Sequence, residues 1–202
     1  HLRLVGFIIG SMTEPIYSQT KHRHREFLPG DQTKAQRVDR IIRVDHAGEF
    51  GAARIYDGQL AVLAGRRSED IIRKMVEQER RHLNHFEDLI ATRAVRPTAL
   101  GPLWHVAGFA LGVFSAALGE RAAMACTEAV ESVIDEHYSK QIEQLGDEEE
   151  ELRAALEDFR QDEVAHRDMA VAHGAEDAPA YKPLSNAIRA GTRLAIWLSE
   201  RV

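Results

Sequence analysis

The feature that most constrains this chain of 202 residues is a repeated pairing of glutamate and histidine one helical turn apart. Glu79 is followed three residues later by His82, and Glu163 is followed in the same way by His166. On an α-helix this spacing places both side chains on one face. Both pairs interrupt the apolar stripe of their segment, where buried residues are expected. Because the burial of unpaired carboxylates is costly, the pattern favours helices that gather these side chains around a compensating charge.

The two pairs belong to an internal repeat. Glu49 precedes Glu79 by 30 residues, and Glu131 precedes Glu163 by 32. In each half a tyrosine follows the first glutamate by seven residues and a glutamine follows it by ten, namely Tyr56 and Gln59, then Tyr138 and Gln141. Agreement at this many positions is improbable by chance, so we predict two helical hairpins that each supply one Glu and then one Glu-x-x-His.

Helical periodicity dominates the chain after residues 29–31, and glycine and proline fall between the periodic stretches. The pattern predicts an all-α fold, a ferritin-like four-helix bundle with helices at about 33–64, 68–93, 120–145 and 148–173. A hydrophobic content of 44% suits one core, so we expect residues 33–202 to form a single domain. We interpret residues 1–32 as a flexible N-terminal segment, a remnant of processing or cloning.

Two further segments are unusually apolar. Residues 98–119 contain no Asp, Glu, Lys or Arg, but their glycines and proline make them a poor membrane span. We predict a crossover between the hairpins whose apolar side meets a membrane surface. Residues 184–201 mix isoleucine, leucine and tryptophan with arginine, which predicts an additional C-terminal amphipathic helix at the same interface. The alternative is that both segments simply pack on the bundle.

Composition excludes several classes of function. A net charge of −6 argues against nucleic acid as a partner, because the neutralisation of phosphates needs a dense basic face. The single cysteine, Cys126, cannot form an internal disulfide and favours a reducing compartment. The lack of paired cysteines also excludes thiolate zinc sites and iron–sulfur clusters.

The repeat therefore predicts a metal site built from four carboxylates and two imidazoles. Its members are Glu49, Glu79, His82, Glu131, Glu163 and His166. Four negative charges balance two divalent cations, and oxygen-rich ligation with one nitrogen per metal suits iron or manganese. Ligand sets of this kind are typical of the ferritin-like di-iron carboxylate bundles. Iron is the first choice because the activation of O2 needs a redox-active metal.

Alternatives remain for individual positions. Glu128 and Asp135 each lie about one turn from Glu131 and could replace it, although the repeat favours Glu131. Tyr56 and Tyr138 are candidates for contacts with the metal ligands or for the lining of a substrate channel, and plain ring packing is the alternative. Three more histidines near these glutamates have no counterpart in the repeat and are left out of the ligand set: His46, His85 and His137.

Several strings in the sequence carry a family resemblance. They include Arg-Val-Asp-His-Ala-Gly-Glu at 43–49, Arg-Ile-Tyr at 54–56, Pro-Leu-Trp at 102–104 and Leu-Ser-Glu-Arg at 198–201. They resemble the demethoxyubiquinone hydroxylases of ubiquinone biosynthesis, and the resemblance covers about residues 26–202. The first string is the most specific of the four. Carried over residue by residue, the ligands of that family fall on the six residues named above.

The resemblance implies a di-iron monooxygenase that uses O2 to hydroxylate the ring of a polyprenylated demethoxy-quinol, with NADH as the source of electrons. It also implies a lipid-binding partner protein, and a peripheral position on the matrix side of the mitochondrial inner membrane or the cytoplasmic side of a bacterial membrane. A homo-oligomer is compatible with it. Two other functions remain open, a ferritin-like iron oxidase or store and a metal-free membrane-associated scaffold.

Overall fold

Local sequence signals explain where the helices begin and end in the computed structural model, which describes residues 30–147 and 149–202. Thr33 caps the first helix, because its hydroxyl accepts from the Gln36 amide at 3.2 Å while the Gln36 side chain accepts from the Thr33 amide at 2.9 Å. Gly146 and Gly174 have φ of +63° and +84°, left-handed conformations that end a helix readily only at glycine.

All regular structure in the described residues is helical. The helices are α1 (Lys34–Leu63), α2 (Glu69–Arg93), α3 (Gly101–Ala117), α4 (Glu120–Leu145), α5 (Glu150–Ala172), the short η1 (Ala175–Asp177) and α6 (Tyr181–Ser199). The predicted helical bundle and its additional C-terminal helix are thus confirmed, and the crossover is itself a helix, α3. Residues 1–29 of the predicted flexible segment lie outside the described residues, so that prediction stays untested.

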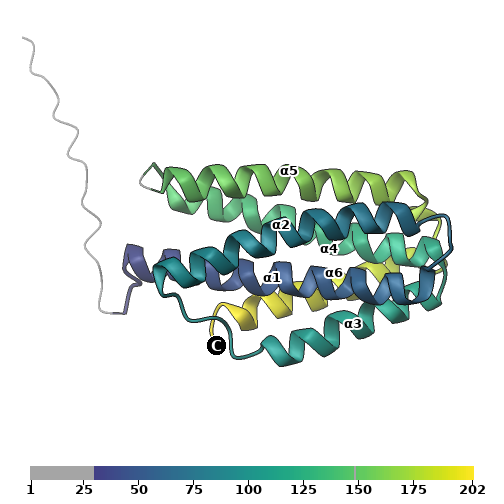
Figure 1. The fold of residues 1–202 in the computed structure, drawn as a ribbon, viewed down its shortest axis with the longest axis horizontal. Helices are drawn as coiled ribbons and strands as arrows, with labels where there is room; N and C mark the ends of the chain where they lie inside the picture. The colour runs from purple at the N-terminus through teal and green to yellow at the C-terminus, as the bar shows by residue number, and fades with distance from the viewer. Residues whose placement is uncertain (1–29, 148) are drawn as a thin grey trace, which may run out of the picture. The chain divides into compact units, whose positions relative to one another are not determined.

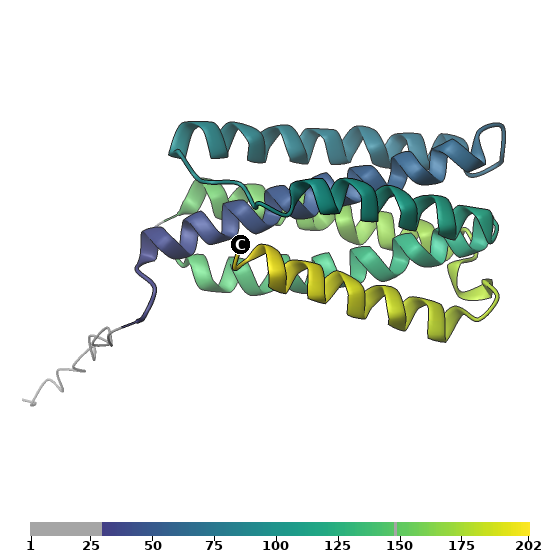
Figure 2. The ribbon, with the colours of Figure 1, turned by 90° about the horizontal axis from the view of Figure 1, so that it is seen from below.

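The helices after residue 32 form three layers of two. In Figures 1 and 2, α1 and α4 form the middle layer, α2 and α5 lie on one side of it, and α3 and α6 lie on the other. The closest pairings are α1 with α3, α4 with α5 and α1 with α2. The predicted ligands come from α1, α2, α4 and α5, so they belong to two layers only.

Glycines set the close packing of α3 on α1. A Cβ atom on Gly58 would lie 2.8 Å from the Val113 amide nitrogen, and one on Gly108 would lie 2.9 Å from the Gly51 carbonyl oxygen. A Cβ atom on Gly112 would overlap the Ile55 carbonyl. These backbones therefore approach too closely for any larger residue. The glycines that make residues 98–119 a poor membrane span are the contact surface of α3.

Within residues 30–147 and 149–202, no helix is both long enough and apolar enough to cross a bilayer.

We expect Gly112→Ala to destabilise the fold by about 1–3 kcal/mol, the usual effect of overpacking, because the added methyl group forces α3 away from α1. Urea unfolding measures this change. Gly191→Ala is the matched control, since nothing lies within 4 Å of its added Cβ atom and α6 should gain up to about 1 kcal/mol. Equal stabilities of the two variants would contradict the packing role of Gly112.

Candidate metal centre

The structure brings the six predicted ligands together in the core. Two overlapping groups have ligand atoms that all lie within 4.8 Å of one another: Glu49, Glu79, His82 and Glu163 form one, and Glu79, Glu131, Glu163 and His166 form the other. Each of the six residues is at most 3% exposed. Glu79 and Glu163 belong to both groups, so these two carboxylates join the two halves of the cluster.

The Nδ1 atom of each histidine faces the carboxylates. His82 Nδ1 lies 3.1 Å from Glu163 Oε1 and 3.3 Å from Glu49 Oε2. His166 Nδ1 lies 3.1 Å from Glu79 Oε1 and 3.3 Å from Glu163 Oε2. Each imidazole therefore approaches carboxylates of both hairpins, Glu49 and Glu163 at His82 and Glu79 and Glu163 at His166.

The outer nitrogen of each histidine is held by the residue directly before the glutamate of the opposite pair. His82 Nε2 lies 3.0 Å from Asp162 Oδ2, and His166 Nε2 lies 3.1 Å from Gln78 Oε1. Gln78 Nε2 also donates to Asp162 Oδ1 at 3.0 Å, which joins the two contacts. Such contacts fix the orientation of a ligating imidazole. Sequence reasoning missed both residues, although their equivalent positions in the repeat were a usable signal.

Tyr56 and Tyr138 each contact a glutamate of the opposite hairpin. The Tyr56 hydroxyl donates to Glu131 Oε1 at 2.6 Å, and the Tyr138 hydroxyl donates to Glu49 Oε1. Burial raises the pKa of both phenols well above the ordinary value, and the charge of the contacted glutamate raises it further. Both tyrosines therefore remain neutral donors, and each hydroxyl holds the first glutamate of the other half.

Several buried atoms of the cluster have no hydrogen-bond partner among the described residues. They are Glu49 Oε2, Glu79 Oε1, His82 Nδ1, Glu131 Oε2, both oxygens of Glu163 and His166 Nδ1. Buried polar atoms of native proteins are normally satisfied, so this concentration needs an explanation. Coordination of two divalent cations would satisfy these atoms and balance four carboxylates, and the mixed oxygen and nitrogen donors suit iron or manganese.

Burial and neighbouring charges shift the pKa values of most side chains in the cluster. Burial raises the pKa of Glu79 and Glu131 well above the ordinary value, and the charge of Glu163 raises both further. Burial would also raise the pKa of Glu163, but the nearby His166 and His82 outweigh it and hold that pKa at about 2. The pKa of each histidine is in turn about 11, because neighbouring carboxylates outweigh burial. Glu79, Glu131 and both histidines thus hold their protons strongly, and bound metal ions would displace those protons.

The alternative ligands on α4 point elsewhere. Glu128 Oε1 accepts from Arg189 Nη2 at 2.5 Å, so this carboxylate faces α6. Asp135 accepts from Arg160 at 2.7 Å and from Arg167 at 3.0 Å, both on α5. The structure therefore places Glu131 in the cluster and gives both alternatives arginine partners outside it.

The histidines without a counterpart in the repeat also lie outside the cluster. His46 and His85 are partly buried, which lowers the pKa of each imidazole. His137 Nε2 lies 3.4 Å from Asp45 Oδ1, which also accepts from Gln141 Nε2 at 2.7 Å. Burial raises the pKa of Asp45 despite these contacts. A buried polar network therefore lies one helical turn from Glu49.

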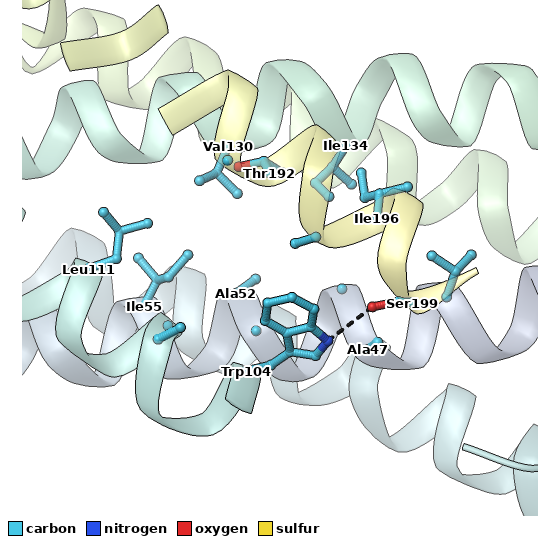
Figure 3. A pocket seen from close by; sticks show the side chains of 17 residues that line it. Ala47, Ala52, Ile55, Trp104, Leu111, Val130, Ile134, Thr192, Ile196 and Ser199 are labelled. Carbon is cyan, nitrogen blue, oxygen red and sulfur yellow. Dashed lines mark hydrogen bonds between the residues drawn. The ribbon is translucent and has the colours of Figure 1, made fainter. Parts of the chain in front are cut away.

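An apolar cavity of about 260 Å³ lies between the middle layer and the helices α3 and α6. Figure 3 shows side chains that line it. Its walls come from α1, α3, α4 and α6. They include Gly48 and Val130, the residues directly before Glu49 and Glu131. The cavity therefore reaches the backbone beside two carboxylates of the cluster. Trp104 also lines it, and the guanidinium of Arg54 lies over the ring of Phe109, 4.9 Å from its centroid.

Comparison with known proteins identifies close relatives. The sequence profile of the family described as "Ubiquinone biosynthesis protein COQ7" matches residues 36–199. The "3-demethoxyubiquinol 3-hydroxylase" of Rhodospirillum rubrum is 58% identical over 177 residues, which are 87% of this chain and 83% of that protein. The human "NADPH-dependent 3-demethoxyubiquinone 3-hydroxylase, mitochondrial" is 52% identical over 176 residues, 85% and 81% of the two chains. The yeast "5-demethoxyubiquinone hydroxylase, mitochondrial" is 37% identical over 220 residues, 98% and 94% of the two chains.

We expect Glu131→Ala to lower the number of iron ions bound per chain, because a buried carboxylate of the cluster is lost. Glu128→Ala, one turn away on the same helix, should leave that number at two because its carboxylate faces Arg189. Anaerobic titration with ferrous iron gives both stoichiometries. Loss of iron from Glu128→Ala with full binding by Glu131→Ala would show that Glu128 is the ligand.

Proposed function

The chain belongs to the ubiquinone biosynthesis protein COQ7 family, and from this membership we propose that it hydroxylates the ring of a polyprenylated demethoxyubiquinol with O2. One oxygen atom becomes the ring hydroxyl and the other leaves as water. The reaction also needs two electrons, for which we propose a reduced nicotinamide nucleotide, NADH or NADPH. The names of the human and Dictyostelium relatives specify NADPH, which supports this class of donor.

The buried cluster is the observation that carries the proposal. We propose that its six residues hold two iron ions: Glu49, Glu79, His82, Glu131, Glu163 and His166. Iron supplies the one-electron redox chemistry that the activation of O2 requires. The protein orients the ligands, since Tyr56 and Tyr138 donate to two carboxylates while Gln78 and Asp162 contact the outer nitrogens of the histidines.

The apolar cavity is the proposed position of the substrate. Its walls are almost entirely hydrocarbon, which suits a polyprenyl tail and excludes water from the ring. Small residues on α1, among them Gly48 and Ala52, leave space beside the cluster. A ring in this space would therefore lie near the carboxylates while its tail runs between α3 and α6.

The other two candidate functions fit the structure less well. An iron store needs a polar exterior, whereas α3 is free of charge and exposes several apolar side chains. A metal-free scaffold would bury four carboxylates with only the two histidines to balance them. Iron content separates the three functions, because we expect two ions per chain for the hydroxylase, many for a store and none for a scaffold.

The outer layer supports a peripheral position on a membrane. Its helices carry most of the large apolar side chains that are more than half exposed: Leu103, Val106, Phe114 and Leu118 from α3 and its end, and Leu194 from α6. An apolar surface of this kind marks a contact with lipid or protein. Several relatives are named as mitochondrial, so we propose the inner membrane for a mitochondrial form. The lipid-binding partner and a homo-oligomer stay predictions.

We expect Glu163→Gln to lower hydroxylation at least about 100-fold, since even residues that only support a metal ligand contribute 10–100-fold. The measurement is the transfer of one atom of ¹⁸O from labelled O2 into the quinol product, followed by mass spectrometry. Glu157→Gln is the matched control on α5, because Glu157 is partly exposed and contacts Arg160 and Gln161. Label that comes from water instead of O2 would rule out the proposed reaction.

Leu103→Ser combined with Val106→Ser should weaken binding to anionic phospholipid vesicles at least about tenfold, since a fully buried large side chain contributes about 1.5–3 kcal/mol. Co-sedimentation measures the binding. The control pair is Met169→Ser with Val171→Ser, two exposed apolar residues of α5 in the layer on the far side. Equal losses in both double variants would mean that α3 is not the membrane contact.

A further inference from the structure

The apolar cavity has two walls that are not packed on each other. No backbone contact joins α3 to α6 within residues 30–147 and 149–202, although both helices line the cavity. α3 rests closely on α1, and α6 rests on α4. The outer side of the cavity is therefore a seam between two helices whose backbones, among the described residues, contact the middle layer but not each other.

One side-chain hydrogen bond crosses this seam in the described part of the chain. Trp104 on α3 donates its indole N–H to the Ser199 hydroxyl, at the end of α6, with an N···O distance of 3.0 Å. Figure 3 shows the indole ring spanning the space between the two helices, beside the cavity. Ser199 is only 3% exposed, so the bond is shielded from water. A neutral bond of this kind contributes a small net free energy and can open readily.

The other half of α6 is held much more firmly. Arg189 Nη2 contacts both oxygens of Glu128, at 2.5 and 2.8 Å, and the Tyr181 hydroxyl donates to the same carboxylate at 3.1 Å. Glu128 is only 6% exposed, so this is a buried charged contact between α4 and the first half of α6. The second half has a weaker ion pair, Arg193 with Glu136 at 3.1 Å, which is about half exposed and contributes little.

The size of the cavity requires an opening. A cavity of about 150 Å³ accommodates a single benzene ring. The volume of about 260 Å³ therefore suits a ring with the first part of a tail, but not a long polyprenyl chain. The rest of such a tail has to leave between α3 and α6, past Trp104.

We propose that Trp104 determines how the protein discriminates between tail lengths, with its bond to Ser199 as a latch across the mouth of the cavity. The inference rests on the proposed function, because it takes a long-tailed quinone as the ligand. The Glu128 contact fixes one end of α6, and the latch controls the other end. A short-tailed quinone fits behind the closed latch, whereas a long-tailed quinone binds only when the latch is open.

Ser199→Ala removes the acceptor with little change in volume, and Trp104→Phe removes the donor. Both should raise kcat/KM about two- to tenfold for a long-tailed demethoxyubiquinol, the range that corresponds to one net hydrogen bond. Because both residues also line the cavity, kcat/KM for a short-tailed analogue measures any effect on the cavity itself, and the ratio of the long-tailed to the short-tailed value should rise about two- to tenfold. Ser185→Ala is the matched control, since Ser185 is a buried serine in the first half of α6 without a partner for its hydroxyl among the described residues. Equal changes with both substrates, or no change, would overturn the proposal.

A binding measurement separates this proposal from the proposed function. The chain has two tryptophans, so Trp104 is the only one in Trp197→Phe protein, and its emission reports directly on the mouth of the cavity. We expect a long-tailed ubiquinone to quench this emission two- to tenfold faster when Ser199→Ala is added. An unchanged rate would overturn the latch, whereas a faster rate without any hydroxylation would support the latch and contradict the proposed reaction.

Discussion

The burial of four carboxylates in the middle of the bundle is the constraint on which the rest of the structure depends. Each carboxylate loses its water shell, at a cost of several kcal/mol per ion even after relaxation of the protein. The fold offsets this cost with groups placed around the cluster, namely two histidines inside it and the hydroxyls of Tyr56 and Tyr138 on its flanks. Each tyrosine serves the opposite hairpin, so neither hairpin completes its surroundings alone. The internal repeat of the sequence therefore matches a repeat in the site, in which each hairpin supplies the tyrosine that contacts the first glutamate of the other.

The middle layer separates two environments of opposite character. The charged cluster lies between this layer and α2 with α5, whereas the apolar cavity lies between it and α3 with α6. A reaction between an apolar substrate and a charged metal site needs both environments within a short distance. Small residues allow this approach, because Gly48 and Ala52, which precede and follow Glu49 on α1, place little side chain between the cavity and the cluster. Small residues, here the glycines of α1 and α3, also let the backbones of these two helices lie close together.

The bundle and the six clustered residues were predictable from the sequence. The period of the apolar residues and the spacing of the glutamates and histidines show which face of each helix is buried. Contacts that depend on the opposite helix were not predictable in this way. The pairing of Glu128 with Arg189 joins residues 61 positions apart, and only the docking of α6 brings them together. The glycines of α3 gave an incomplete signal. They make residues 98–119 a poor membrane span, but the close contact with α1 that explains them requires the position of the partner helix.

Departures from the repeat explain why the two halves differ outside the cluster. Small residues of α1 correspond in the repeat to larger ones of α4: Gly48, Gly51 and Ala52 correspond to Val130, Val133 and Ile134. α3 can therefore approach α1 more closely than α6 approaches α4, and the cavity opens beside the small residues. Ile55, which lines the cavity, corresponds to His137, which contacts the buried Asp45. The repeat is thus kept at the six clustered residues and lost in the flanks, where an apolar cavity lies beside Ile55 and a buried polar network includes His137.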